Sequence, residues 1–362
     1  MRRPQRMPQR ARGLVEPMAQ YAPPPPVDPA RLTGVIERFR SRRVAVVGDV
    51  MADEFIYGRV ERVSREAPVL ILRYDATIVV PGGAGNAANN VAALGARVRL
   101  AAVAGRDEAG RRMLAALDRR VSRGHVLVAP DYGTPVKTRI LAGGVHSAKQ
   151  QVVRIDRLVN GAPDGTRRRA FEARARAAAA GADAVLISDY GSGLVTPTLV
   201  ERLRRSLWRG TRRVPVLVDS RYAALDFHGV TASTPNESEV EQILGVRIGD
   251  DQRALETAGR ELLGRARMQA LLVTRGGRGM ALFEPGEPTR HIPIFGSDEI
   301  ADVTGAGDTV IATMTLALAA GASFYEAARL ANYAGGIVVM KRGTATVSAD
   351  ELREAVRSES RM

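Results

Sequence analysis

The segment Asp302-Val-Thr-Gly-Ala-Gly-Asp-Thr309 places an acid beside a glycine-rich turn, where an apolar helix is predicted to begin. Glycines let a backbone approach a ligand closely, and the free N–H groups of a helix start bind phosphate or a developing negative charge. Asp308 would repel such an anion, but it could take the proton from a hydroxyl that attacks a phosphate. On its own, the segment predicts phosphoryl transfer about as well as an ordinary helix cap, in which Asp308 stabilises the first turn.

Predicted strands and helices alternate along most of the chain. Short apolar runs predict buried strands at residues 44–49, 184–188, 214–219 and 270–274. The alternation predicts an α/β fold with a doubly wound, mostly parallel sheet and helices on both faces. Ligand sites in such sheets lie at the carboxyl ends of the strands, so polar residues there should share one edge. Those residues are Asp49, Asp189, Asp219 and Thr274.

Two segments break this alternation, at roughly residues 55–80 and 135–157. We interpret them as extra strands that form a small β-flap, or lid, over the ligand edge. Lys137, Arg139 and Lys149 lie on this flap and could bind a phosphate on a substrate, although solvated surface charge explains them equally well. We expect one folded domain over residues 31–362, after a disordered, basic and proline-rich tail at residues 1–30.

The composition excludes several classes of protein. The chain has 362 residues and no cysteine, which excludes disulfides and thiolate metal sites, and its four histidines are too scattered for a zinc site. The net charge of +14 comes almost entirely from dispersed arginines, which does not favour a dedicated nucleic-acid binder. No apolar stretch fits a secretory signal or a membrane span, so we expect a soluble, cytoplasmic protein.

The segment Gly82-Gly-Ala-Gly-Asn-Ala-Ala88 matches a GxGxxA pattern, with Asp107 about twenty residues later, which is a weak dinucleotide-binding signal. The segment does not follow the first strand, and Pro81 interrupts the strand before it. Asn86 also supplies an amide that a dinucleotide site does not need. We therefore favour a glycine-rich helix start that binds sugar hydroxyls. The chain contains neither a Walker A motif nor the protein-kinase motif set.

The segment Thr234-Pro-Asn-Glu-Ser-Glu239 places Asn236 and Glu239 three residues apart at a predicted helix start. Facing the same side, the two could hold water around Mg²⁺, which prefers oxygen ligands and keeps much of its hydration. The alternative is a capping box, with Asn236 as the N-cap and Glu239 as its partner. The pattern alone favours the capping box.

In this order and spacing, the motifs together resemble those of the ribokinase-like (PfkB-type) carbohydrate kinases, from about Arg43 to about Leu352. The motifs are Gly82-Gly83 with Asn86, Thr234-Pro-Asn236 with Glu239, Val273-Thr-Arg-Gly-Gly277, and Asp302-Val-Thr-Gly-Ala-Gly-Asp308. Within this family the chain is most similar to D-glycero-β-D-manno-heptose 7-phosphate kinases, which form the kinase half of a bifunctional ADP-heptose synthesis enzyme. Supporting stretches include Ser64-Arg-Glu-Ala-Pro-Val69 and Ile187-Ser-Asp-Tyr-Gly191.

The resemblance implies an ATP- and Mg²⁺-dependent kinase that phosphorylates the anomeric hydroxyl to give a 1,7-bisphosphate, often as a homodimer joined through the flap. Asp308 would be the base, and the backbone N–H groups of Gly305, Ala306 and Gly307 would stabilise the transferring phosphoryl group. The sugar would be held by Asp49 or Asp53, Gly83 and Asn86, and we add Lys137 and Asp189 as substrate-binding candidates. The nucleotide site would be bordered by Asp219, Asn236, Thr274, Gly277 and Asn332, and Asn236 and Glu239 would hold Mg²⁺ through water.

Two residues depart from the heptose-kinase pattern. Ser192 stands where lysine is usual, so the substrate could be another sugar or sugar phosphate, and Arg65 stands where proline is usual. A catalytically silent member that binds sugar or nucleic acid as a regulator is a further alternative, but the intact Asp308 and its glycines favour an enzyme. We expect any nucleotidyltransferase activity to come from another protein, because nothing after residue 357 could encode it. The sequence leaves open whether a monovalent cation assists.

Overall fold

The computed structural model describes residues 27–143, 149–158, 163–209, 211–296, 302–341 and 343–359. Most of the predicted tail, residues 1–26, lies outside these ranges. Helix α1 (Pro29–Glu37) begins inside the predicted tail. The side chain of Asp28 accepts a hydrogen bond from Ala30 N at the helix start, and Pro29 occupies the first turn. The predicted boundary at residue 30 therefore falls within a helix.

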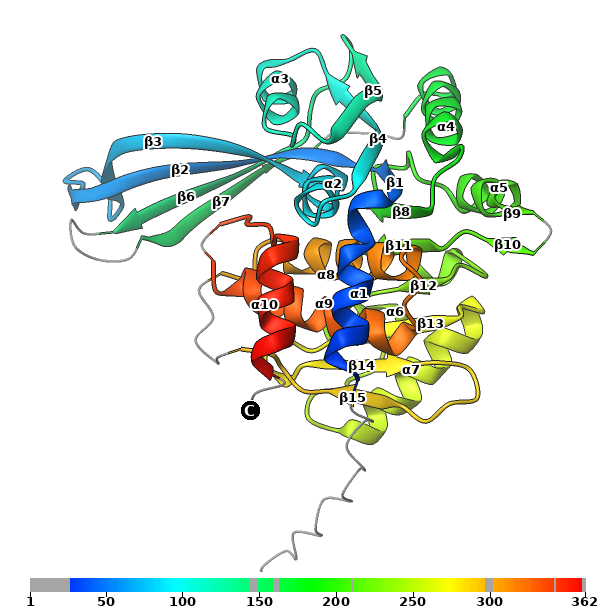
Figure 1. The fold of residues 1–362 in the computed structure, drawn as a ribbon. Coiled ribbons are helices and arrows are strands. Elements are labelled where there is room, and N and C mark those ends of the chain that lie inside the picture. Colours follow the sequence, from blue (N-terminus) through cyan, green and yellow to red (C-terminus); the bar gives the residue numbers. More distant parts are fainter. Residues whose placement is uncertain are drawn as a thin grey trace, which may run out of the picture.

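Within the described ranges, the central sheet has nine strands in the order β15-β14-β13-β12-β11-β8-β1-β4-β5 (Figure 1). Across the sheet these are β15 (Arg290–Ile292), β14 (Met280–Phe283), β13 (Ala270–Thr274), β12 (Ala232–Ser233), β11 (Val216–Ser220), β8 (Ala184–Asp189), β1 (Arg43–Gly48), β4 (Arg97–Gly105) and β5 (Val121–Ala129). The strands from β13 to β5 pair in parallel, and β14 and β15 add an antiparallel edge. The predicted doubly wound, mostly parallel sheet is confirmed.

Helices cover both faces of this sheet, because its strands are apolar on both faces. In β1, Val44 and Val46 pack into one hydrophobic layer, whereas Ala45 and Val47 pack into the other. The first layer contains α1, α2 (Ala84–Ala93), α3 (Glu108–Ala115), α8 (Ala306–Ala319), α9 (Phe324–Val339) and α10 (Ala349–Glu359). The second contains α4 (Gly165–Ala179), α5 (Pro197–Leu207), α6 (Glu237–Leu244) and α7 (Gln252–Ala266).

The flap is a separate four-stranded sheet that projects from the body of the molecule (Figure 1). Its order is β3 (Leu70–Gly83), β2 (Val50–Val63), β6 (Val136–Gly143) and β7 (Gln150–Arg157). β2 continues almost directly from β1, and β3 leads directly into α2. The base of the flap is therefore anchored at the carboxyl edge of the central sheet. A small hairpin pairs β9 (Trp208–Arg209) with β10 (Arg212–Arg213).

Several elements were not anticipated from the sequence: α3, β5, β12, β14 and β15. The side chain of Asp107 caps α3 by accepting from Gly110 N at 2.7 Å, and it also accepts from Thr134 N at 2.7 Å. The acid of the apparent dinucleotide motif is therefore a structural cap. Among the described helices, none has the length and apolar character needed to cross a bilayer.

Candidate functional site

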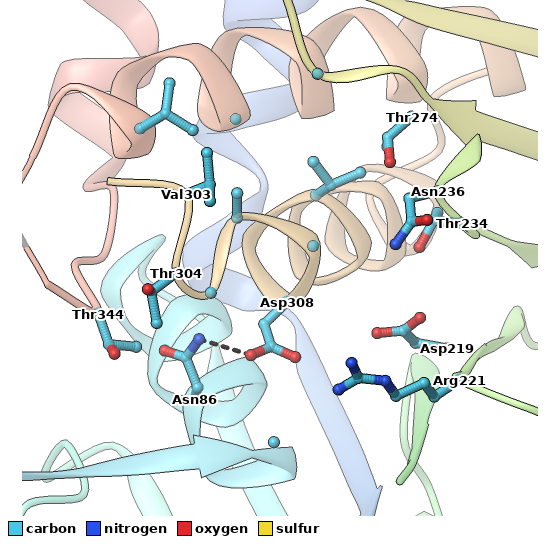
Figure 2. A pocket seen from close by; sticks show the side chains of 18 of the residues that line it. Asn86, Asp219, Arg221, Thr234, Asn236, Thr274, Val303, Thr304, Asp308 and Thr344 are labelled. Atoms are coloured by element: carbon cyan, nitrogen blue, oxygen red, sulfur yellow. Dashed lines mark hydrogen bonds between the residues drawn. The ribbon is translucent and has the colours of Figure 1, made fainter. Parts of the chain in front are cut away.

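A cavity of about 570 Å³ opens at the carboxyl edge of the parallel strands, between the flap and the start of α8 (Figure 2). The predicted site residues that line it are Asp53, Gly83, Asn86, Lys137, Asp189, Asp219, Asn236, Glu239, Thr274, Gly305, Ala306, Gly307, Asp308 and Asn332. Two predicted residues, Asp49 and Gly277, are not part of the lining. The structure therefore brings together most of a set that spans the whole chain.

The start of α8 leaves backbone N–H groups facing the cavity. Gly305 is the N-cap, with a left-handed φ of 80°, and a Cβ there would lie 2.6 Å from Asn86 Nδ2, so only glycine fits. Ala306 N donates to Val303 O at 3.2 Å. The N–H groups of Gly307 and Asp308 have no hydrogen-bond partner among the described residues. These two are thus available to an anion.

Asp308 is buried in the first turn of α8, with 6% of its surface exposed. Its Oδ2 accepts a hydrogen bond from Asn86 Nδ2 at 2.7 Å (Figure 2), and its Oδ1 accepts one from the Tyr190 hydroxyl at 3.2 Å. Burial raises the pKa of Asp308 to about 6, and these two donors oppose part of that rise. A carboxyl group with this pKa is ionised at neutral pH and accepts a proton more readily than an ordinary aspartate.

A buried network fixes the orientation of the Asn86 amide. Asn90 Nδ2 donates to Asn86 Oδ1 at 3.1 Å, and Asn90 Oδ1 accepts from Thr309 Oγ1 at 2.8 Å. Since the Asn86 oxygen is thereby occupied, its nitrogen points at Asp308. Helix α2, where the sequence predicted sugar binding, also holds the proposed base in place.

Asp53 and the cations of the flap form the wall opposite α8. Asp53 pairs with Arg139 at 2.5 Å, and both side chains are largely buried. Lys137 lies beside Asp53 in the β2–β6 register, with its Nζ 5.1 Å from the centroid of the Tyr190 ring. Burial lowers the pKa of Lys137. This wall presents both a hydrogen-bond acceptor and positive charge to a ligand.

Asp49 has a structural role beneath the cavity. Its carboxylate accepts from Tyr190 N at 2.8 Å, from Ser192 N at 3.2 Å and from Ser192 Oγ at 2.5 Å. These bonds hold the loop after β8, which carries Tyr190. Of the two alternatives for the sugar-binding acid, Asp53 lines the cavity and Asp49 supports it. The Ser192 side chain is occupied by Asp49.

The other end of the cavity gathers carboxylates. Asn236 and Glu239 form a complete capping box at the start of α6, with both bonds 2.9 Å long, and both residues also line the cavity. Burial raises the pKa of Glu239. Burial also raises the pKa of Asp219 well above its usual range, and the negative charges of Asp308 and Glu239 raise it further. Burial therefore opposes the ionised form of both carboxyl groups at this end of the cavity.

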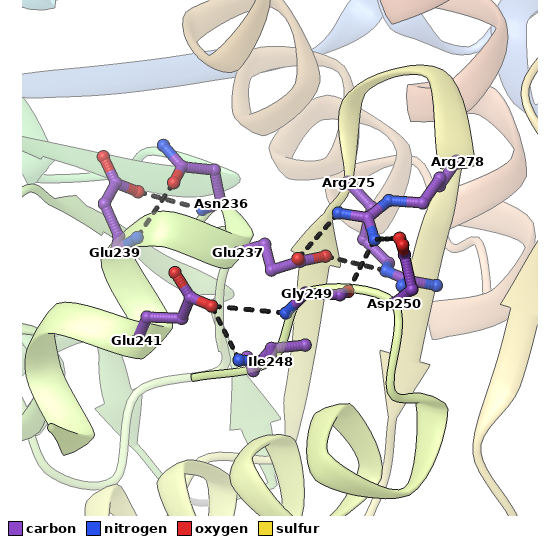
Figure 3. A network of polar contacts seen from close by, with 9 residues as sticks. All are labelled: Asn236, Glu237, Glu239, Glu241, Ile248, Gly249, Asp250, Arg275 and Arg278. Carbon is purple, nitrogen blue, oxygen red and sulfur yellow. Dashed lines mark hydrogen bonds and ion pairs between the residues drawn. The ribbon is translucent and has the colours of Figure 1, made fainter. Parts of the chain in front are cut away.

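Glu237 connects this end of the cavity to the turn after β13 (Figure 3). Its carboxylate accepts from Arg275 Nε at 2.9 Å and from Arg278 Nη2 at 2.7 Å, and the side chains of Glu237 and Arg275 are each 11% exposed. Arg278 also donates to Gly249 O and Asp250 Oδ1. The pairs join α6 to the β13–β14 turn.

The turn held by Glu237 contributes Thr274, Gly276 and Gly279 to the cavity lining. Gly277 lies in the same turn but outside the lining, and a Cβ there would meet no atom within 4 Å. Its contact with a nucleotide stays a prediction. Asn332 lines the cavity from α9 and donates to Pro293 O at 2.9 Å.

Several lining residues were missed as site residues from the sequence: Tyr190, Arg154, Arg221, Thr234, Thr304 and Thr344. Tyr190, Arg221, Thr234 and Thr304 lie within two residues of predicted site residues, so this closeness in sequence was the available signal. The Oγ1 atoms of Thr234 and Thr344 are buried without a hydrogen-bond partner in the described part of the chain. Unpartnered buried hydroxyls beside a cavity indicate a ligand that would satisfy them.

Comparisons of sequence show the family to which the chain belongs. The chain matches the family described as pfkB family carbohydrate kinase over residues 41–351. Proteins named bifunctional protein HldE from Caulobacter vibrioides and Geobacter sulfurreducens are 41% and 42% identical to it over 320 and 313 residues. These matches cover 87% and 85% of this chain and 63% and 61% of the relatives. The chain thus spans about three fifths of the length of these curated relatives.

Comparisons of structure agree on the fold. The ribokinase of Arabidopsis thaliana, solved with ribose and ATP, superposes with a TM-score of 0.68 at 19% identity, covering 87% of this chain and 99% of that one. Phosphofructokinase-2 of Escherichia coli, solved with substrates and products, superposes with a TM-score of 0.67 at 19% identity, covering 88% and 99%. At this identity the likeness establishes a ribokinase-like fold.

The raised pKa of Asp308 predicts that the folded protein gains stability when this charge is removed. A carboxyl whose pKa is about 6 when folded and near its ordinary value of 3.8 when unfolded destabilises the native state at high pH. We expect Asp308→Asn to raise the free energy of unfolding by about 3 kcal/mol near pH 8 and by roughly half as much near pH 5. Urea denaturation at the two pH values measures the difference. A gain that does not shrink with falling pH would contradict the assignment.

Proposed function

Because this chain belongs to the pfkB family of carbohydrate kinases, we propose that it transfers the γ-phosphoryl group of ATP to the anomeric hydroxyl of D-glycero-β-D-manno-heptose 7-phosphate. The observation that carries the proposal is the juxtaposition, in one cavity, of Asp308 with the free N–H groups at the start of α8. The choice of sugar rests on the motifs that resemble heptose 7-phosphate kinases and on the two relatives described above.

Asp308 acts as the general base. The sugar hydroxyl oxygen attacks the γ-phosphorus and forms a new O–P bond, while the bond from that phosphorus to the β–γ bridging oxygen breaks. The hydroxyl proton passes to Asp308, and ADP leaves with the bonding electron pair. Asn86 and Tyr190 hold the two carboxylate oxygens in place, at 2.7 and 3.2 Å, so that proton transfer needs little rearrangement. The N–H groups of Gly307 and Asp308 support the charge on the phosphoryl oxygens.

The residues at the acidic end of the cavity fit a hydrated Mg²⁺ ion. Asp219 and Glu239 both have pKa values raised by burial, and Glu239 uses only Oε2 in the capping box, which leaves Oε1 for water. Asn236 and Glu239 can therefore form the capping box and also hold the water shell of a metal ion. When bound, Mg²⁺ neutralises part of the triphosphate charge. Asp219, Glu239 and Asn236 would hold it through its water shell.

The cations of the flap support a phosphorylated sugar. Lys137, Arg139 and Arg154 line the cavity from β6 and β7, on the side of Asp53 where the sugar would lie. Ser192 has no charge and is bound to Asp49, so the flap replaces the lysine expected at that position. Because Ser192 departs from the heptose-kinase pattern while the flap cations remain, another sugar phosphate is the second candidate substrate. A catalytically silent regulator is less well supported, because the base and its hydrogen-bond donors are all present.

We expect purified protein with ATP and Mg²⁺ to form ADP with heptose 7-phosphate and to act much more slowly on the unphosphorylated heptose. A coupled assay across a panel of sugars and sugar phosphates tests this, with each sugar omitted in turn as the control. Preferred turnover of a different sugar phosphate would replace the heptose with the second candidate. No turnover of any member would remove the kinase proposal.

The base role predicts a pH profile with a defined sign. Since Asp308 must be ionised to accept a proton, kcat/KM should fall about tenfold per pH unit below roughly pH 6. Asp308→Asn should lower kcat by roughly 100- to 10,000-fold while ATP binding stays near normal. Asp350→Asn removes an exposed acid on α10 and serves as the control. Near-normal turnover in Asp308→Asn would refute the base.

The exposed apolar side chains of the flap support a homodimer. In the flap and just after it, they are Val60, Val63, Leu70, Tyr74, Ile78, Val152, Val153, Ile155 and Leu158, each at least 39% exposed. Val63 and Leu70 are cross-strand partners, and Val153 and Ile155 lie two apart on one face of β7. Apolar side chains gathered on one thin sheet are costly to leave in water, and a second copy of the flap would cover them.

We expect Val153→Glu with Ile155→Lys to convert a dimer into a monomer, because charges would replace apolar contacts at the interface. Light scattering after size-exclusion chromatography measures the mass. The matched control, Val246→Glu, changes an apolar side chain of the body that is 39% exposed. A wild-type monomer at micromolar concentration would contradict the proposed dimer.

A further inference from the structure

Two cations in the cavity, Lys137 and Arg221, form no ion pair with any described residue. The other two cations of the lining are engaged, since Arg139 pairs with Asp53 and Arg154 pairs with Asp156. Lys137 belongs to the flap and lies against Tyr190 on the sugar side. Arg221 belongs to the central sheet, immediately after β11. The mechanism described above assigns Arg221 no role.

The backbone of Arg221 is anchored, and its guanidinium extends into the cavity. Its N–H donates to Asp189 O at 3.2 Å, and the guanidinium carbon lies 5.9 Å from the centroid of the Tyr222 ring. Figure 2 shows the side chain extending from the end of β11 toward Asp308, with Asp219 next to it. An anchored backbone with an exposed head group suits a residue that binds a ligand.

The position of Arg221 puts this charge between the two ends of the cavity. It lies next to Asp219 of the nucleotide end, and its side chain extends toward Asp308 (Figure 2). Lys137, at the sugar end, lines the same cavity. In the proposed reaction, the phosphoryl group moves from the nucleotide end of the cavity to the sugar end.

A second polar atom in this region also lacks a partner. Thr234 is 4% exposed, lines the cavity, and its Oγ1 has no hydrogen bond within the described ranges. Figure 2 shows Thr234 beside Asn236, at the end of the cavity that contains Asp219. A buried hydroxyl donor and an unpaired guanidinium in one cavity favour a ligand with several anionic oxygens.

We propose that Arg221 is a catalytic residue that binds the non-bridging oxygens of the phosphoryl group during its transfer. This inference rests on the proposed kinase function. The phosphoryl group carries negative charge on three oxygens as the old bond breaks and the new one forms, and a planar guanidinium can donate to two of them. The N–H groups of Gly307 and Asp308 approach from α8, and Arg221 approaches from β11. The two sets of donors enclose the group.

The first test is the substitution Arg221→Met, assayed with the sugar that the wild type phosphorylates best. We expect kcat to fall roughly 100- to 1,000-fold, the loss typical of removing one preorganised donor, with KM for both substrates changing less than about threefold. Added guanidinium ion should restore part of the activity of Arg221→Met. The control, Arg253→Met, removes an exposed arginine of α7 and should keep wild-type kcat. Circular dichroism and nucleotide binding check that each variant is folded.

A second arm separates the transferring phosphoryl from a phosphate already on the sugar. If Arg221 serves phosphoryl transfer, the variant loses the same factor with phosphorylated and unphosphorylated sugars. The proposal is overturned if only KM for the sugar phosphate rises, or if the loss disappears with the unphosphorylated sugar. If no sugar is turned over by the wild type, the proposed function fails separately. The slow hydrolysis of ATP by the wild type and by Arg221→Met is then compared. Equal rates in the two proteins reject the proposed role of Arg221.

Discussion

The site depends on the burial of one ionised carboxylate, that of Asp308. Removing it from water raises its pKa to about 6, and the hydrogen bonds from Asn86 and Tyr190 keep that rise moderate. With more burial and no donors the acid would stay protonated at neutral pH, and with full exposure it would be a weak base. The two donors come from α2 and from the loop after β8, so the balance requires the folded sheet.

The rest of the cavity contains both paired and unpaired charges, and Asp53 with Arg139 is one of the pairs. Asp219 and Glu239 lie at one end, and Lys137 and Arg221 form no ion pair with the residues that the structure describes. Burial lowers the pKa of Lys137, so its charge is unfavourable while no anionic ligand is bound. The proposed ligands, a nucleotide with its metal ion and a sugar phosphate, would supply the opposite charges. The arrangement therefore sacrifices stability for complementarity to ligands.

Several acids near the motifs of the sequence have structural roles, because their side chains hold loops and helices in place. Asp49 holds the Tyr190 loop, Asp107 caps α3, and Glu237 ties α6 to the turn after β13 (Figure 3). Glu239 combines both roles, since one oxygen completes a capping box while the residue lines the cavity. A structural role for a carboxylate therefore does not exclude a functional one, because each group has two oxygens.

Local sequence was enough to predict the alternation of strands and helices, the ligand edge, and the Asp302–Asp308 turn, because each depends on residues close together along the chain. It could not show that Asp53 lines the cavity whereas Asp49 and Gly277 do not, and it missed Arg221 and Tyr190 as lining residues. Those outcomes depend on register: β2 pairs with β6 so that Asp53 lies beside Lys137, whereas Asp49 precedes the flap and faces the β8 loop. Strand register and loop packing arise only from contacts between distant segments, so only the tertiary structure showed which acids line the cavity.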